Sequence, residues 1–153
     1  PFFQGSDVAG LLGIFGIGGA LAASRVGAIS KHISKNTLIT IGSSLIVISW
    51  LIFGIWGASD VGLIVGIILL DMGLQSMHVT NQTIALAAHP EASNRMNTIY
   101  MVSYFIGGSF GTYIGGWVWG INGWKAAVIA GIIFGGIGLI GHLIFAKDTK
   151  FKL

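Results

Sequence analysis

Apolar residues run along the chain in long segments that short polar or charged stretches separate. Each segment is close to the roughly 20 residues that a helix needs to cross about 30 Å of hydrocarbon. The segments cover about residues 8–29, 37–58, 61–84, 97–119 and 126–146. They lack the alternating polar pattern of a barrel strand, so we expect helices. The pattern therefore predicts an all-α, polytopic transmembrane helical bundle with five membrane-spanning helices.

Composition agrees with a membrane environment. Hydrophobic residues make up 54% of the 153 residues and charged residues only 8%, whereas soluble domains carry about a quarter charged residues. The net charge of +3 does not indicate nucleic acid, because the basic residues lie at segment ends and form no continuous patch. The chain has no cysteine, which excludes disulfides and thiol chemistry. The predicted surroundings are a lipid bilayer.

Positive charges indicate the orientation of the segments, because Lys and Arg accumulate in short cytoplasmic loops. We expect the N-terminus outside and the C-terminus in the cytoplasm, with Lys125 outside. The basic residues then placed in the cytoplasm are Arg25, Lys31, Lys35, Arg95, Lys147, Lys150 and Lys152. Four tryptophans fall at the predicted outer boundary, where an indole can keep its N–H near water. They are Trp56, Trp117, Trp119 and Trp124.

A polar stripe interrupts the third segment, in the stretch LLDMGLQSMHVTNQ at residues 69–82. On a helix, Gln75, His78 and Gln82 lie at about +40°, −20° and +20° from Asp71, so the four share one narrow face. An Asp at the bilayer centre costs about 2.5 to 3.5 kcal/mol even on mild scales. We therefore expect this face to line a bundle interior or a wet cavity.

Two interpretations of the stripe stay open. Asp71 can be a protonated, hydrogen-bonded structural residue, or it can load and release protons while Gln75 and Gln82 orient a solute. His78 lies two turns from Asp71, so coupling between them needs water or a substrate. Tyr100 and Tyr104 share a face of the fourth segment and either line the same cavity or lie at the cytoplasmic interface. Together these six residues form the predicted proton and substrate pathway.

Glycines recur every four residues in the fourth segment, at Gly107, Gly111 and Gly115, and in the fifth at Gly131 and Gly135. Small residues let helix backbones approach closely in lipid, where packing drives association. We expect these rows to be helix-packing seams.

No enzyme signature is present. The chain has no glycine-rich phosphate loop followed by Lys-Ser/Thr and no HExxH pair, so we predict no enzymatic activity, no metal and no cofactor. Among the functions of membrane proteins, we therefore expect secondary transport of a small solute. The alternative is a small structural or assembly membrane subunit whose polar stripe binds partner helices.

Two stretches resemble a known family. ILLDMGLQSMHVTNQT at residues 68–83 and RMNTIYMVSYFIGGSFGTYIGGWVWGINGW at residues 95–124 resemble major facilitator superfamily carriers, specifically bacterial drug/proton antiporters and sugar-efflux carriers. The resemblance implies helices 8 to 12 of a twelve-helix carrier in the bacterial inner membrane. It also implies proton-coupled efflux by alternating access, with the third segment bordering the central cavity. Because the chain starts PFFQGSD, we expect the N-terminal transmembrane half to be a missing partner of this C-terminal portion.

Overall fold

The computed structural model describes residues 33–146, so the predicted segment 8–29 lies outside the described residues. The order of elements is α3 (Lys35–Trp56), α4 (Asp60–Ala88), the short 3₁₀ helix η1 (Pro90–Ala92) and α5 (Ser93–Phe145). Residues 33–146 contain no strand. The predicted all-helical class is confirmed for this part of the chain.

Local sequence explains where α3 and α4 begin and where α4 ends. The Ser34 side chain accepts a hydrogen bond from the backbone N–H of Thr37, and Ser59 does the same for Gly62, both at 3.1 Å. These N-caps satisfy backbone donors that a helix start leaves free. Helix α4 ends at Ala88, two residues before Pro90, because proline disfavours helix in the residue that precedes it.

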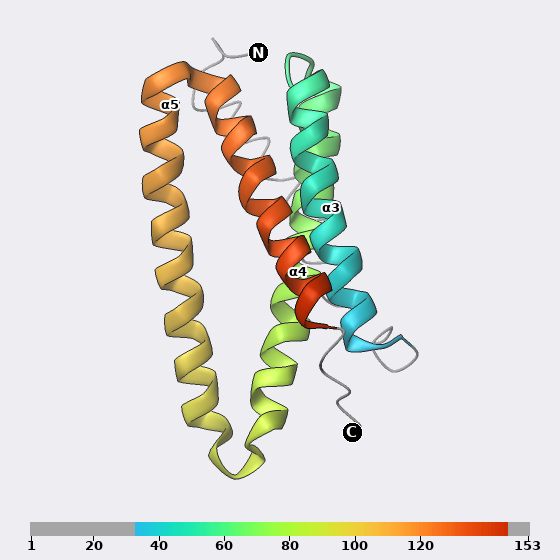
Figure 1. Cartoon of the computed structure of the whole chain (residues 1–153), viewed down its shortest axis with the longest axis vertical. Coiled ribbons are helices and arrows are strands. Elements are labelled where there is room, and N and C mark those ends of the chain that lie inside the picture. Colours follow the sequence, from blue (N-terminus) through green and yellow to red (C-terminus); the bar gives the residue numbers. More distant parts are fainter. Residues whose placement is uncertain (1–32, 147–153) are drawn as a thin grey trace.

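Helix α5 is bent into two arms by Asn122 and Gly123, whose backbone angles are not helical. Gly123 has φ +55°, a conformation that glycine adopts without the steric cost of a Cβ. The first arm, residues 93–121, and the second arm, residues 124–145, run in opposite directions (Figure 1). The break lies between the expected fourth and fifth spans. If α5 is counted as one continuous helix, residues 33–146 contain three helices that are long and apolar enough to cross a membrane. The expected number of five membrane-spanning helices stays a prediction.

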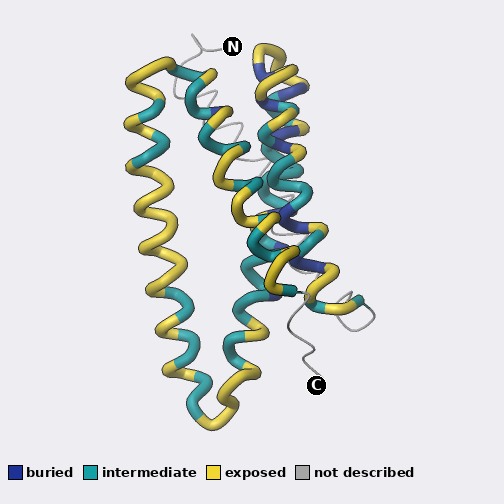
Figure 2. Tube along the Cα trace, in the orientation of Figure 1, coloured by how far each residue is buried: buried dark blue, intermediate teal, exposed yellow. Residues whose placement is uncertain are grey.

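The core lies between α3, α4 and the second arm of α5. Helices α3 and α4 pack most extensively, and the second arm covers α3. Figure 2 shows buried residues concentrated on α3 and α4, while the first arm of α5 has none. That arm is joined to the rest of the described chain mainly at its two ends.

Aromatic rings and hydrogen bonds join α5 to both ends of α3. Trp124 donates from its indole N–H to the Phe53 carbonyl at 3.1 Å, and the two rings meet edge-on. At the other end, the His142 Nε2 lies 3.1 Å from both the Asn36 carbonyl and the Thr40 hydroxyl. The second arm therefore runs antiparallel to α3 along its length.

Candidate functional site

The polar stripe of α4 lies opposite the face that packs in the core. The buried residues of α4 are Gly62, Gly66, Gly73, Ser76 and Thr80. At 100° per residue they fall at about 140° to 220° from Asp71, across the helix from the stripe. The stripe residues themselves are all partly exposed. Packing with α3 therefore leaves the stripe available to other elements.

The half of the predicted stripe that lies nearer to η1 meets the first arm of α5. The Tyr100 hydroxyl lies 3.0 Å from the His78 carbonyl oxygen and 3.1 Å from His78 Nδ1. The Tyr104 ring packs on the His78 ring with centroids 4.5 Å apart and planes tilted by 57°. The sequence placed His78 on the third segment and both tyrosines on one face of the fourth, and the structure brings these residues into direct contact.

Gln82 extends this contact by one turn. Its Nε2 donates to the Asn97 Oδ1 at 2.9 Å and lies 4.0 Å from the Met101 sulfur. Sequence reasoning missed Asn97 as a partner of the stripe. The available signal was its position: Asn97 precedes Tyr100 and Met101 by one turn, so all three share a face of α5.

Asp71 and Gln75 lie farther from the α4–α5 connection, where the two helices diverge (Figure 1). Both are partly exposed, and neither side chain makes a hydrogen bond or ion pair with another residue in the range 33–146. His78 does not contact Asp71, as their spacing predicts. The stripe thus divides into a half held by α5 and a half without a described partner.

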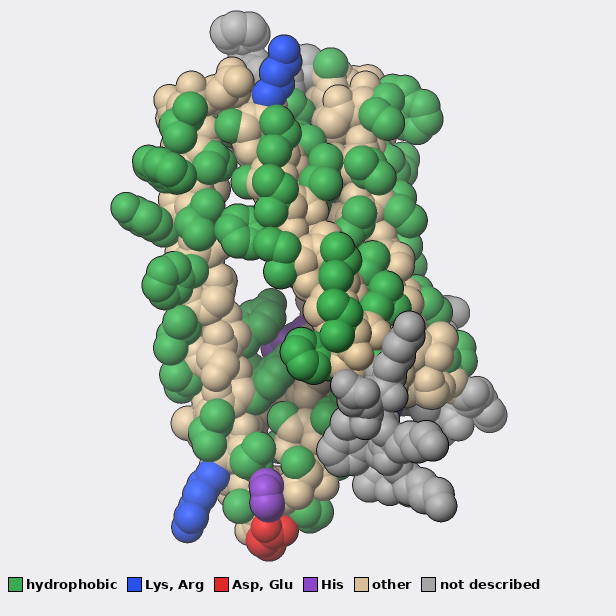
Figure 3. Space-filling model, viewed as in Figure 1, with side chains coloured by type: hydrophobic (Ala, Val, Ile, Leu, Met, Phe, Trp, Pro, Cys, Tyr) green, Lys and Arg blue, Asp and Glu red, His purple; other side chains and the backbone are tan. Residues whose placement is uncertain are grey.

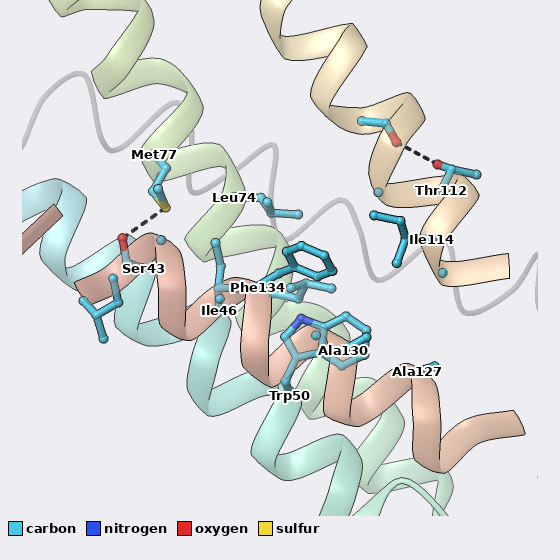
Figure 4. A pocket seen from close by; sticks show the side chains of 18 residues that line it. Ser43, Ile46, Trp50, Leu74, Met77, Thr112, Ile114, Ala127, Ala130 and Phe134 are labelled. Atoms are coloured by element: carbon cyan, nitrogen blue, oxygen red, sulfur yellow. Dashed lines mark hydrogen bonds between the residues drawn. The ribbon is translucent and has the colours of Figure 1, made fainter. Parts of the chain in front are cut away.

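A separate cavity of about 640 Å³ lies between α3, α4 and both arms of α5. Figure 3 shows an opening between the arms of α5, bordered by apolar side chains. Figure 4 shows Trp50, Leu74, Ile114 and Phe134 around the cavity. No described lining residue belongs to the polar stripe, and neither Tyr100 nor Tyr104 is among them.

The hydroxyl groups of this cavity are already used inside the protein. Ser43 donates to the Ile39 carbonyl at 2.7 Å and lies 3.3 Å from the Met77 sulfur, while Thr112 donates to the Gly108 carbonyl at 3.0 Å. Its described lining carries no charged side chain. This cavity offers little to recognise a polar solute, in contrast to the stripe.

The glycine rows in the two arms of α5 have different surroundings. A Cβ at Gly131 would overlap the Trp50 ring, and one at Gly135 would lie 3.3 Å from the Val47 Cγ2. A Cβ at Gly107, Gly111 or Gly115 would meet nothing within 4 Å. The second arm therefore uses its glycines for packing on α3, while a seam at Gly107, Gly111 and Gly115 stays a prediction that needs an element beyond the described residues.

Within residues 33–146 the helices are long and apolar, and the breaks in them lie at helix ends and at Asn122–Gly123. A polar stripe within one apolar helix completes the features that define the class, a multi-pass helical membrane protein. The sequence profile of the Major Facilitator Superfamily matches residues 3–152. The chain therefore belongs to the major facilitator superfamily.

Two relatives illustrate the similarity. The protein named "Uncharacterized transporter YgaY" from Escherichia coli O157:H7 is 37% identical over 131 residues, which cover 86% of this chain and 33% of that protein. "Probable transporter SCO4007" from Streptomyces coelicolor is 29% identical over 116 residues, which cover 76% of this chain and 27% of that protein. The chain thus spans about a third or less of the length of these relatives. No solved structure matches it.

Proposed function

We propose that this chain forms helices 8 to 12 of a secondary carrier that moves a small solute outward across a bacterial inner membrane, driven by protons and working by alternating access. One observation carries the proposal. Asp71 lies on the face of α4 opposite the core, and its carboxyl group has no hydrogen-bond or ion-pair partner within residues 33–146. Ionisable groups inside membranes cost free energy and usually serve a transport pathway.

In this proposal Asp71 carries the coupled proton. A carboxyl group that faces a cavity can be neutral while it is occluded and ionised while it is wetted, which links proton movement to the conformational cycle. Gln75 lies one turn away, and its amide makes no hydrogen bond within residues 33–146. This amide can donate to and accept from a solute. The other end of the same pathway consists of residues that α4 and α5 hold in contact, namely Gln82, His78, Tyr100 and Tyr104.

The proposed partner is the remainder of the same carrier. Carriers of this kind place the substrate site between two halves, and the chain spans about a third or less of its relatives. The open row at Gly107, Gly111 and Gly115 suits close packing with one of those other helices. The proposed orientation, with the N-terminus outside and the C-terminus in the cytoplasm, rests on the distribution of Lys and Arg.

Membership of the superfamily favours the carrier over the alternative of a structural or assembly subunit. The two make different demands on Asp71. A carrier needs the carboxyl group to titrate, whereas a subunit that only binds partner helices needs a hydrogen-bonding side chain of similar size.

Everted inner-membrane vesicles that contain the full-length carrier test the proposed activity. The vesicles are energised with lactate and offered radiolabelled lactose or radiolabelled tetraphenylphosphonium, a sugar and a lipophilic cation. We expect one of the two to accumulate above the level in vesicles without the carrier, and a protonophore to abolish the accumulation. Accumulation that survives the protonophore contradicts proton coupling, and accumulation in right-side-out vesicles alone contradicts outward transport.

A further inference from the structure

The contact between Tyr100 and His78 determines which nitrogen of the histidine carries the proton. The Tyr100 hydroxyl lies 3.0 Å from the His78 carbonyl oxygen and 3.1 Å from His78 Nδ1. A phenol has one proton to donate, and a carbonyl oxygen can only accept. The hydroxyl therefore donates to the carbonyl.

The second contact then needs a donor on the histidine. With its proton engaged by the carbonyl, the tyrosine oxygen can only accept from Nδ1, so Nδ1 must carry hydrogen. If the hydroxyl donated to a bare Nδ1 instead, the tyrosine oxygen and the carbonyl oxygen would be two acceptors 3.0 Å apart with no proton between them. Of the two neutral tautomers of the ring, only the one with hydrogen on Nδ1 satisfies both contacts.

We propose that Tyr100 is a positioning residue that holds neutral His78 with its proton on Nδ1, so that the Nε2 lone pair accepts a hydrogen bond from an O–H or N–H group of the solute. This inference deepens the proposed function and rests on it for the solute. The tautomer itself rests only on the geometry of the two residues.

The position of Nε2 suits this role. The two ring nitrogens lie on different edges of the imidazole, so Nε2 is directed away from the Tyr100 hydroxyl. Within residues 33–146, Nε2 has no hydrogen-bond partner, and the His78 side chain is partly exposed. Tyr104, whose ring centroid lies 4.5 Å from that of His78, restricts rotation of the imidazole out of this orientation.

The stripe then offers two acceptors on one face. Asp71 precedes His78 by seven residues, which is about 10 Å along a helix. An ionised carboxylate accepts hydrogen bonds only, and Nε2 in this tautomer does the same. A solute that carries several O–H or N–H donors, such as a sugar, fits this arrangement better than a cation without donors.

Nitrogen-15 NMR of histidine-labelled, full-length carrier in lipid bilayers tests the tautomer without any gradient or solute. The His78 signals are assigned by their loss in His78→Gln, and the spectra are taken where the ring is neutral. We expect a protonated Nδ1 and a bare Nε2 in the wild type. Tyr100→Phe should remove this preference. Tyr104→Phe is the matched control and should preserve it, because the Tyr104 hydroxyl makes no hydrogen bond within the described part of the chain.

A proton on Nε2 in the wild type, or an unchanged spectrum in Tyr100→Phe, overturns the positioning role. Thermal unfolding of each variant separates a local effect from loss of the fold.

The same Nε2 signal tests whether the solute donates a hydrogen bond to His78. Lactose offers many hydroxyl donors, and tetraphenylphosphonium offers none. We expect saturating lactose to shift the Nε2 signal towards that of a hydrogen-bonded nitrogen and tetraphenylphosphonium to leave it in place. A shift with tetraphenylphosphonium alone, or with neither compound, overturns the role in solute recognition. Neither result depends on a proton gradient, so failure of the proposed proton coupling remains a separate outcome.

Discussion

Gly42 and Gly73 face each other where α3 meets α4, and neither position has room for a side chain. A Cβ on Gly73 would lie 2.6 Å from the Gly42 carbonyl oxygen, and a Cβ on Gly42 would lie 2.9 Å from the Gly73 carbonyl oxygen. Close backbone approach of this kind stabilises helix pairs in lipid through van der Waals contact. The seam also fixes the rotation of α4, and that rotation places Asp71 on the opposite side.

Gly73→Ala should therefore destabilise the full-length carrier by about 1 to 3 kcal/mol, the usual cost of overpacking. Gly116→Ala is the matched control. A Cβ there meets nothing within 4 Å, and alanine favours the helix by up to about 1 kcal/mol. Thermal unfolding in detergent measures both variants, and equal midpoints for the two would mean that the seam does not hold α3 and α4 together.

Trp124→Phe should cost about 0.5 to 1.5 kcal/mol, the net value of one hydrogen bond. The substitution keeps an aromatic ring against Phe53 but removes the indole N–H that donates to the Phe53 carbonyl at 3.1 Å. Trp117→Phe serves as a control on the exposed side of α5, where Trp117 is 63% exposed. If both variants unfold at the temperature of the wild type, Trp124 does not join the two helices through this bond.

A double-mutant cycle on Gln82 and Asn97 should give a coupling of about 0.6 kcal/mol, as interhelical hydrogen bonds in membranes do on average. The cycle compares Gln82→Ala, Asn97→Ala and the double variant by reversible unfolding. The same cycle on Gln75 and Asn97 should give no coupling, because Gln75 makes no hydrogen bond with a described residue. Strict additivity in the first cycle would contradict the contact seen at 2.9 Å.

Cysteine labelling tests the proposed orientation. Ala58 and Asn94 are exposed at opposite ends of α4, and neither side chain caps a helix. In a full-length carrier without other cysteines, an impermeant thiol reagent on intact cells should label Ala58→Cys and spare Asn94→Cys until the cells are opened. The reverse pattern would show that the predicted orientation is inverted.

The elements that short-range patterns encode were predictable. Helix needs only an apolar run and terminating signals. Proline disfavours helix in the residue before it, so Pro90 marks the C-terminal end of α4. The bend of α5 at Asn122–Gly123 falls in the interval between the predicted segments 97–119 and 126–146. The shared face of Asp71 and Gln75 follows from helix periodicity alone.

Partners across helices were not predictable, because they depend on how α4 and α5 are aligned. Four-residue glycine spacing occurs in both arms of α5, yet only Gly131 and Gly135 pack against described residues. The four-residue spacing of glycines shows that another helix can approach closely, but it does not identify that helix. The contacts of His78 with Tyr100 and of Gln82 with Asn97 depend on the same alignment, which no local pattern specifies.

In the proposed carrier, the Asp71 carboxyl group couples solute movement to protons. Asp71→Asn keeps size and hydrogen-bonding capacity but removes titration. Asp60→Asn, at the exposed first turn of α4, is the matched control for loss of a carboxylate. Both variants and the wild type are reconstituted in proteoliposomes at equal density, with the solute that accumulates in everted vesicles.

The deciding measurement is solute flux under an imposed pH gradient, together with solute exchange in the absence of a gradient. We expect Asp71→Asn to abolish gradient-driven flux but to retain exchange, and Asp60→Asn to retain both. Gradient-driven flux in Asp71→Asn equal to that of the wild type would contradict this expectation and leave Asp71 as a structural hydrogen-bonding residue.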